Sequence, residues 1–234
     1  MKRTLSAIVL CLVAATAAAA QTPVPVQGKP RPTPPPAPAE VSDPHAGHKM
    51  GQEKEKEKKE EQSAAGKWFS DVELLDQDGR KVRFYSDLLK GKTVVVNAFF
   101  TTCASVCPPM NRNMEKIQEA LGPRLGKEVF LISISVDPAT DTPPRLKEYA
   151  RKFNAKPGWV FLTGKKENVD WALYKLGQYV ESKDDHTTVI IVGNETTGLW
   201  KKAFGLAKLG DLVQIVESVA NDKGEAAGET GGSK

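Results

Sequence analysis

Two cysteines separated by three residues are the part of this sequence with the clearest capacity for chemistry. Cys103 and Cys107 follow an apolar run, residues 93–100, and precede Pro108 and Pro109. A thiolate is both the nucleophile of disulfide exchange and a ligand for soft metal ions. The spacing lets both sulfur atoms reach one ion or each other. It therefore indicates a redox pair, a metal site or a structural disulfide, although a disulfide that closes so short a loop would stabilise the fold weakly.

His186 offers a third ligand. It stands directly before residues 187–192, which we expect to form a strand. If that strand runs antiparallel to the strand at 93–100, its start lies at the same edge of the sheet as the cysteines. Two thiolates and one imidazole make a soft site of low coordination that suits Cu(I), whereas zinc usually takes a fourth ligand. The other interpretation is an exposed loop histidine, and the residues alone leave both open.

The elements that must position these side chains alternate between strands and helices. Every aromatic residue lies between Trp68 and Phe204, which places the folded domain at residues 67–221. Strands are expected at 71–75, 81–85, 93–100, 128–136, 159–162, 187–192 and 199–204. Helices are expected at 110–121, 143–153, 166–179 and 206–219. The alternation predicts an α/β sandwich with a central mixed sheet flanked by helices and an extra N-terminal hairpin.

This arrangement puts both cysteines in the loop between the C-terminal end of a strand and the N-terminus of a helix. Functional groups usually gather at that edge of an open α/β sheet. The unpaired N–H groups and the dipole of the helix favour a thiolate there. The sequence thus predicts reactive thiols at Cys103 and Cys107.

The two ends of the chain differ from its middle. Residues 1–20 have a basic start, an apolar run and small residues before Gln21, as is typical of a cleaved secretory signal that leads to the periplasm. An uncleaved membrane anchor is the alternative. Residues 21–66 hold nine of the sixteen prolines and a run of alternating charges, which predicts a disordered linker. Residues 222–234 are expected to form a disordered tail.

Composition narrows the class of protein. A formal net charge of +4 in 234 residues is too small to indicate a nucleic-acid partner. Three cysteines are too few for a scaffold held by disulfides, and Cys11 would leave with the signal.

In the linker, His45, His48 and Met50 are suitable copper ligands. They indicate either an auxiliary site that collects metal weakly or an accidental cluster in a polar segment.

These motifs together resemble the Sco/SenC family of copper-handling, thioredoxin-like proteins. The resemblance covers most of residues 67–215 and rests on several motifs in a fixed order. They are Cys103-x-x-x-Cys107-Pro108, Ser135-Val136-Asp137-Pro138, Asp141-Thr142-Pro143, Tyr149, Asp185-His186-Thr187 and Phe204-Gly205. The sequence departs from the family at Ala104, where a proline is usual, and at Phe100-Thr101, where the aromatic residue is usually tyrosine.

The resemblance implies a thioredoxin-like fold and a copper site formed by Cys103, Cys107 and His186. It implies a periplasmic metallochaperone that holds copper as Cu(I) or Cu(II) and delivers it to the CuA centre of cytochrome c oxidase. Oxidation of the cysteine pair to a disulfide would abolish binding, so delivery would follow the redox state. The expected partners are the copper-bearing subunit of the oxidase and other copper carriers or thiol reductants, with or without a membrane tether.

The alternative function is a periplasmic thiol–disulfide oxidoreductase that reduces the cysteines of a partner. Cys103 and Cys107 would then be a catalytic, redox-active disulfide. The chain has no proline after Pro157, so it lacks the cis-proline that thioredoxins place opposite their cysteines, which favours metal binding. Asp137 and Asp141 are expected to be structural, the first in a turn and the second at the start of a helix.

Overall fold

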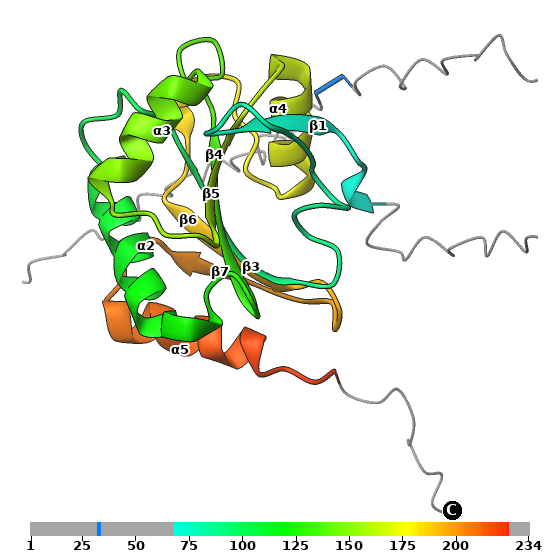
Figure 1. Ribbon diagram of the computed structural model, residues 1–234, viewed down its shortest axis with the longest axis vertical. Helices are drawn as coiled ribbons and strands as arrows, with labels where there is room; N and C mark the ends of the chain where they lie inside the picture. The colour runs from blue at the N-terminus through cyan, green and yellow to red at the C-terminus, as the bar shows by residue number, and fades with distance from the viewer. Residues whose placement is uncertain (1–31, 34–67, 225–234) are drawn as a thin grey trace, which may run out of the picture. The chain divides into compact units, whose positions relative to one another are not determined.

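The computed structural model describes residues 32–33 and 68–224, and a seven-stranded mixed sheet forms the centre of this described part (Figure 1). The strands are β1 Glu73–Asp76, β2 Lys81–Arg83, β3 Thr93–Phe99, β4 Val129–Ser135, β5 Trp159–Thr163, β6 Val189–Asn194 and β7 Leu199–Phe204. The helices are α2 Cys107–Leu121, α3 Pro143–Lys152, α4 Lys166–Lys175 and α5 Leu209–Ala220, with short 3₁₀ turns η1 Gly122–Arg124 and η2 Lys183–Asp185.

The strands lie in the order β2-β1-β5-β4-β3-β6-β7. The three central strands β5, β4 and β3 are parallel, and β1, β6 and β7 pair antiparallel with their neighbours. β3 is buried along its whole length, as its largely apolar sequence predicts for a strand covered on both faces. β1 and β2 form the extra N-terminal hairpin. The predicted α/β sandwich with a central mixed sheet is confirmed.

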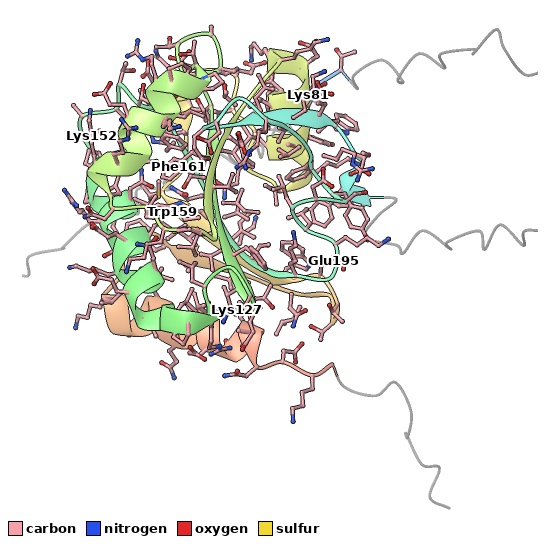
Figure 2. The ribbon with its side chains drawn as sticks, in the orientation of Figure 1. Lys81, Lys127, Lys152, Trp159, Phe161 and Glu195 are labelled. Carbon is pink, nitrogen blue, oxygen red and sulfur yellow. The ribbon has the colours of Figure 1, made fainter. Side chains whose placement is uncertain are left out.

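Helices cover both faces of the sheet. α2, α3 and α5 lie on one face and α4 on the other (Figure 1). The first face holds the larger hydrophobic core, to which β3, β4, β5 and β6 contribute alternate residues. Figure 2 labels Trp159 and Phe161, which extend from β5 toward α2 and α3. Their rings stack with centroids 5.0 Å apart, and the Phe161 ring also packs against Tyr149 of α3, with centroids 6.2 Å apart.

Three helix boundaries differ from the predictions by three residues or more. α5 begins at Leu209 instead of residue 206, because the chain first turns after Phe204, whose carbonyl accepts from the N–H of Ala207 at 2.9 Å. Another of these boundaries concerns a cysteine. α2 begins at Cys107 instead of residue 110, because Pro108 and Pro109 occupy the first turn, where a missing N–H costs nothing. The prediction that both cysteines lie in a loop is therefore wrong for Cys107. α4 ends at Lys175 instead of 179, because Gly177 has a φ of 68°, which reverses the chain after a helix.

Several predictions concern residues outside the described ranges. The signal at 1–20 and the cluster of His45, His48 and Met50 lie there, as does nearly all of the linker at 21–66. These segment boundaries, with the domain at 67–221 and the tail at 222–234, stay predictions. Among the residues that the structure does describe, no helix is long and apolar enough to cross a membrane.

Candidate metal centre

Cys103 lies in the tight turn that follows β3. Its backbone N–H donates to the carbonyl oxygen of Phe100 at 3.2 Å, which folds the chain back over the end of the strand. The residue is 8% exposed, so it is nearly covered by its neighbours but less completely than Cys107. The turn thus presents one sulfur atom at the C-terminal edge of the sheet.

Cys107 is the first residue of α2 and is fully buried. Its backbone N–H donates to Sγ of Cys103 at 3.4 Å, so the start of the helix directs a donor at the other sulfur. Both cysteines are free thiols in this structure. Because one residue sits in the turn and the other in the first helical turn, the three intervening residues bring the two side chains together.

His186 reaches the same edge from a distant part of the sequence. β6 pairs antiparallel with β3, with Ile190 opposite Asn97, so the residues just before β6 lie where β3 ends. Nε2 of His186 is 3.2 Å from Sγ of Cys107. The ring also packs edge-on against Phe100, with centroids 5.0 Å apart. The antiparallel arrangement that the sequence analysis required is the one observed.

The carbonyl of Lys183 fixes the orientation of the His186 imidazole. Nδ1 of the ring is 2.8 Å from this oxygen. A carbonyl can only accept, so in the neutral ring the proton is on Nδ1, and Nε2 directs a lone pair toward Cys107. A backbone carbonyl on the far nitrogen is the usual support of a metal-binding histidine.

The two sulfur atoms and one imidazole nitrogen together could hold a metal ion. The ligand atoms of Cys103, Cys107 and His186 all lie within 4.8 Å of one another. Two cysteines and a histidine form a soft donor set that fits copper. The structure therefore brings together all three residues that the sequence singled out, while their roles as ligands and as a redox pair stay predictions.

The two thiols differ in acidity. Burial by itself raises the pKa of the Cys103 thiol, but hydrogen bonds from Cys107 and Ser105 outweigh it and leave the pKa below the ordinary 9.0. Burial, together with the hydrogen bond to Cys103, raises the pKa of the Cys107 thiol to about 12. The pKa of Cys103 is thus shifted in the direction that favours a thiolate and that of Cys107 in the opposite direction, where burial outweighs the helix dipole, while the reactivity of both thiols stays a prediction.

Asp141 joins the cysteine turn to the sheet. Its fully buried carboxylate accepts from the N–H of Thr101 at 3.1 Å and from the hydroxyl of Ser135 at 2.6 Å. The hydroxyl of Thr101 donates to it as well, at 2.5 Å. These contacts link β4 to the loop after β3. The expected structural role is thus right in kind, but its contacts lie in the turn before Cys103 instead of at the start of α3.

Sequence reasoning missed one ion pair at this edge. Nζ of Lys183 lies 2.7 Å from Oδ2 of Asp137 and 5.4 Å from the centre of the Phe100 ring. The backbone carbonyl of Asp137 accepts from Thr140, which forms the turn expected there. The carboxylate itself reaches across to η2. No local signal marks this pair, since the two residues are 46 positions apart.

The mixed sheet, the covering helices and the thiol pair where a strand meets a helix define a thioredoxin-like protein with a candidate site for a soft metal ion. Comparison with known proteins then identifies the family. The family model described as SCO1/SenC matches residues 58–218, so the chain belongs to the SCO1/SenC family. The predicted membership and the thioredoxin-like fold are confirmed.

Two curated relatives illustrate the likeness in sequence. The "SCO1 protein homolog" of Bacillus subtilis is 35% identical over 118 residues, which are 49% of this chain and 60% of that protein. A "Putative copper-binding protein" of Stutzerimonas stutzeri is 32% identical over 106 residues, 45% of this chain and 50% of that protein. The chain thus spans about half the length of the curated relatives it matches.

Solved structures show the same fold. A SCO1/SenC family lipoprotein from Bacillus anthracis is 27% identical with a TM-score of 0.56, covering 65% of this chain and 95% of its own. Arabidopsis thaliana ScoI with copper bound is 25% identical with a TM-score of 0.54, covering 64% of this chain and 95% of its own. Yeast Sco1 with copper bound has the same identity and TM-score, covering 65% and 92%.

Proposed function

We propose that this protein is a copper metallochaperone that carries copper on Cys103, Cys107 and His186. The observation that carries the proposal is the convergence of three soft ligand atoms within 4.8 Å at one edge of the sheet. Three solved structures with the same fold are described as having copper bound, which supports the same metal here.

The chemistry of the donors favours copper over zinc. Two thiolates and one imidazole satisfy Cu(I), which accepts low coordination and soft ligands. Zinc usually takes four ligands, and the cluster in the described part of the chain has three. The burial of Cys103 and Cys107 also shields bound Cu(I) from water. The cargo is therefore a copper ion, held as Cu(I) in the reduced protein.

Release of the cargo follows from the same two sulfur atoms. Ligand exchange passes copper to a partner that offers thiolates, and we propose the copper-bearing subunit of cytochrome c oxidase as that partner. One relative in the comparisons is described as a member of the Sco family of cytochrome c oxidase assembly proteins. Oxidation of the empty pair by a partner disulfide joins Cys103 to Cys107 and passes two electrons and two protons to the partner thiols.

A second function, disulfide reduction in a partner protein, is supported by the difference between the two thiols. Cys103 is the more acidic and the more exposed, so it is suited to attack a disulfide. Cys107 is buried against it and is placed to resolve the mixed disulfide. In this function His186 would not be required for turnover, which separates the two proposals.

The proposal includes the periplasm as the place of action, which rests on the signal-like sequence of residues 1–20 alone. Other copper carriers or thiol reductants would load and reduce the protein there. The predicted cluster of His45, His48 and Met50 would collect metal only weakly.

An anaerobic Cu(I) titration against a competing chelator tests the function. The reduced protein should bind one Cu(I) tightly. His186→Ala should weaken binding by more than about 100-fold, because loss of even an outer-sphere partner of a ligand costs about 10- to 100-fold. The matched control is the double variant His45→Ala/His48→Ala, which should bind as the wild type does. Unchanged weak binding in all three proteins, together with turnover of protein disulfides, would establish the oxidoreductase instead.

A further inference from the structure

The turn η2 holds His186 through its own backbone. Within it the N–H of Asp185 donates to the carbonyl of Ser182 at 3.0 Å, and the N–H of Asp184 to the hydroxyl of Ser182 at 3.4 Å. The N–H of His186 donates to the carbonyl of Lys183 at 3.3 Å. The same carbonyl accepts from the imidazole at 2.8 Å. The direction of the ring therefore depends on where the backbone of Lys183 lies.

The side chain of Lys183 fixes that backbone to the rest of the fold. Its Nζ lies 2.7 Å from Oδ2 of Asp137, in the loop between β4 and α3, and so ties η2 to a distant part of the chain. Asp137 follows β4 and is itself held by Ser135, whose hydroxyl accepts from the N–H of Asp137 at 3.0 Å. The carboxylate is 13% exposed, so the pair is partly shielded from solvent.

The same ammonium group also meets the ring that packs on the histidine. Nζ of Lys183 lies 5.4 Å from the centre of the Phe100 ring, and that ring packs edge-on against His186 at 5.0 Å. A cation over an aromatic face is attractive. Lys183 thus acts on the imidazole in two ways. Its carbonyl accepts from the ring directly, and its ammonium group contacts Phe100, which packs against the ring.

We infer that Lys183 is a positioning residue for the ligand His186, with Asp137 as its anchor. The ion pair holds η2 against the end of β4, and this places the carbonyl that orients the imidazole toward the two sulfur atoms. The inference rests on the proposed function, in that the oriented nitrogen serves to bind copper. It assigns a role to a pair that neither binds the metal nor lies beside the cysteines.

Metal affinity and ring orientation test this role together. Lys183→Met keeps the aliphatic stem and removes the charge, and we expect it to weaken Cu(I) binding by about tenfold, the lower end of the loss seen for partners of metal ligands. Lys183→Arg should keep Cu(I) affinity close to that of the wild type, because the arginine still offers a charged donor to Asp137. Asp137→Asn should match Lys183→Met, and the double variant should lose no more than either single one.

The matched control is Lys147→Met on α3. Lys147 pairs with Asp78 at 2.8 Å and its side chain is 51% exposed, against 40% for Lys183. Its loss removes an equivalent surface ion pair and should leave copper affinity unchanged. Equal losses in both methionine variants would overturn the inference, because the effect would then be one of general charge or stability.

Long-range ¹H–¹⁵N NMR spectra of the metal-free protein provide a second readout, with the His186 signals assigned by their absence in His186→Ala. The wild type should show a proton on Nδ1, and Lys183→Met should show a mixture of the two tautomers. An unchanged tautomer in Lys183→Met overturns the inference even if the wild type binds no copper. Failure of the wild type to bind Cu(I) refutes the proposed function separately. If Lys183→Met does not fold, Asp137→Asn serves in its place for both measurements, the Cu(I) affinity and the tautomer of His186.

Discussion

Nε2 of His186 lies 3.2 Å from Sγ of Cys107, although 79 positions separate the two residues in the chain. The contact joins the residues before β6 to the first residue of α2. It exists because β6 runs antiparallel to β3, which ends at the cysteine turn. Nδ1 of the ring carries the proton toward Lys183, so the thiol of Cys107 is the donor in this contact. A shift of the residues before β6 or of the start of α2 would therefore change the distance between His186 and Cys107, although all three ligands are still present.

The two thiols should react with alkylating agents at different rates. In the reduced, metal-free protein at about pH 8, iodoacetamide should modify Cys103 at least about tenfold faster than Cys107, because the thiolate is the reactive form. The pKa of Cys103 lies below 9.0 and that of Cys107 at about 12. Raising the pH should therefore bring the rate at Cys103 to its plateau first, while the rate at Cys107 continues to rise. Mass spectrometry of quenched samples measures both rates.

The chain unfolded in guanidinium is the control for this comparison. There neither burial nor the hydrogen bond between the two thiols persists, so both should react at similar rates. Faster modification of Cys107 in the folded protein would contradict the assignment of the accessible thiol.

Replacing Asp141 should destabilise the domain. Asp141→Ala leaves the N–H of Thr101 and the hydroxyl of Ser135 without their acceptor in a buried setting. We expect the free energy of unfolding to fall by about 2–4 kcal/mol, since each buried group left unpaired costs about 1–3 kcal/mol. Urea unfolding followed by tryptophan fluorescence measures the change. The control is Glu148→Ala on α3, whose carboxylate is 71% exposed. A similar small change in both variants would show that Asp141 does not hold the turn.

A methyl group added at Gly193 should disturb the pairing of β6 with β7. The Cβ of an alanine there would lie 2.1 Å from the Trp200 ring, which stands opposite it in the register. Gly193→Ala should lower the free energy of unfolding by about 1–3 kcal/mol, as overpacking usually does. In a Trp200→Ala background the same substitution should cost little, because the obstructing ring is gone.

Gly210→Ala is the control, since its added Cβ meets nothing within 4 Å and α5 gains a better helix former. This variant should be neutral or stabilising in the same thermal or urea unfolding. If Gly193→Ala lowers the free energy of unfolding equally in the presence and in the absence of the Trp200 ring, the steric explanation is refuted.

The ion pair of Asp137 should make stability depend on pH in acid. Burial alone would raise the pKa of this carboxyl, but hydrogen bonds from Lys183 and Thr140 leave the pKa below the ordinary 3.8. The folded state thus favours the carboxylate, and its contribution is complete above 3.8 and disappears as the pH falls through the lower folded pKa. The stability advantage of the wild type over Asp137→Asn should therefore shrink between about pH 5 and about pH 2.5.

Urea unfolding of both proteins across that range measures the difference. Lys183→Met should reduce the pH dependence of the wild type, because it removes the group that holds the pKa down. A difference between wild type and Asp137→Asn that stays constant with pH would contradict the pairing.

Much of the fold was predictable because its signals are local. The largely apolar runs at β3 and β4 indicated buried strands, and Pro143 with its neighbour marked the start of α3. α2 starts three residues before the predicted position, because Pro108 and Pro109 form its first turn instead of preceding it. Cys107 therefore belongs to a helix and not to a loop, and it is buried.

The sequence by itself determined which groups can do chemistry here: two thiols at a spacing that lets them meet, one histidine before a strand, and an order of motifs that indicates the family. Residue types and spacing are enough for this, because the donor properties of sulfur and imidazole do not depend on the fold. Only the tertiary structure decided that His186 lies against Cys107, that the two thiols differ in acidity, and that Lys183 reaches Asp137. These depend on strand order and burial, which bring distant residues together and set the local dielectric, and neither property is encoded in any short stretch of the chain.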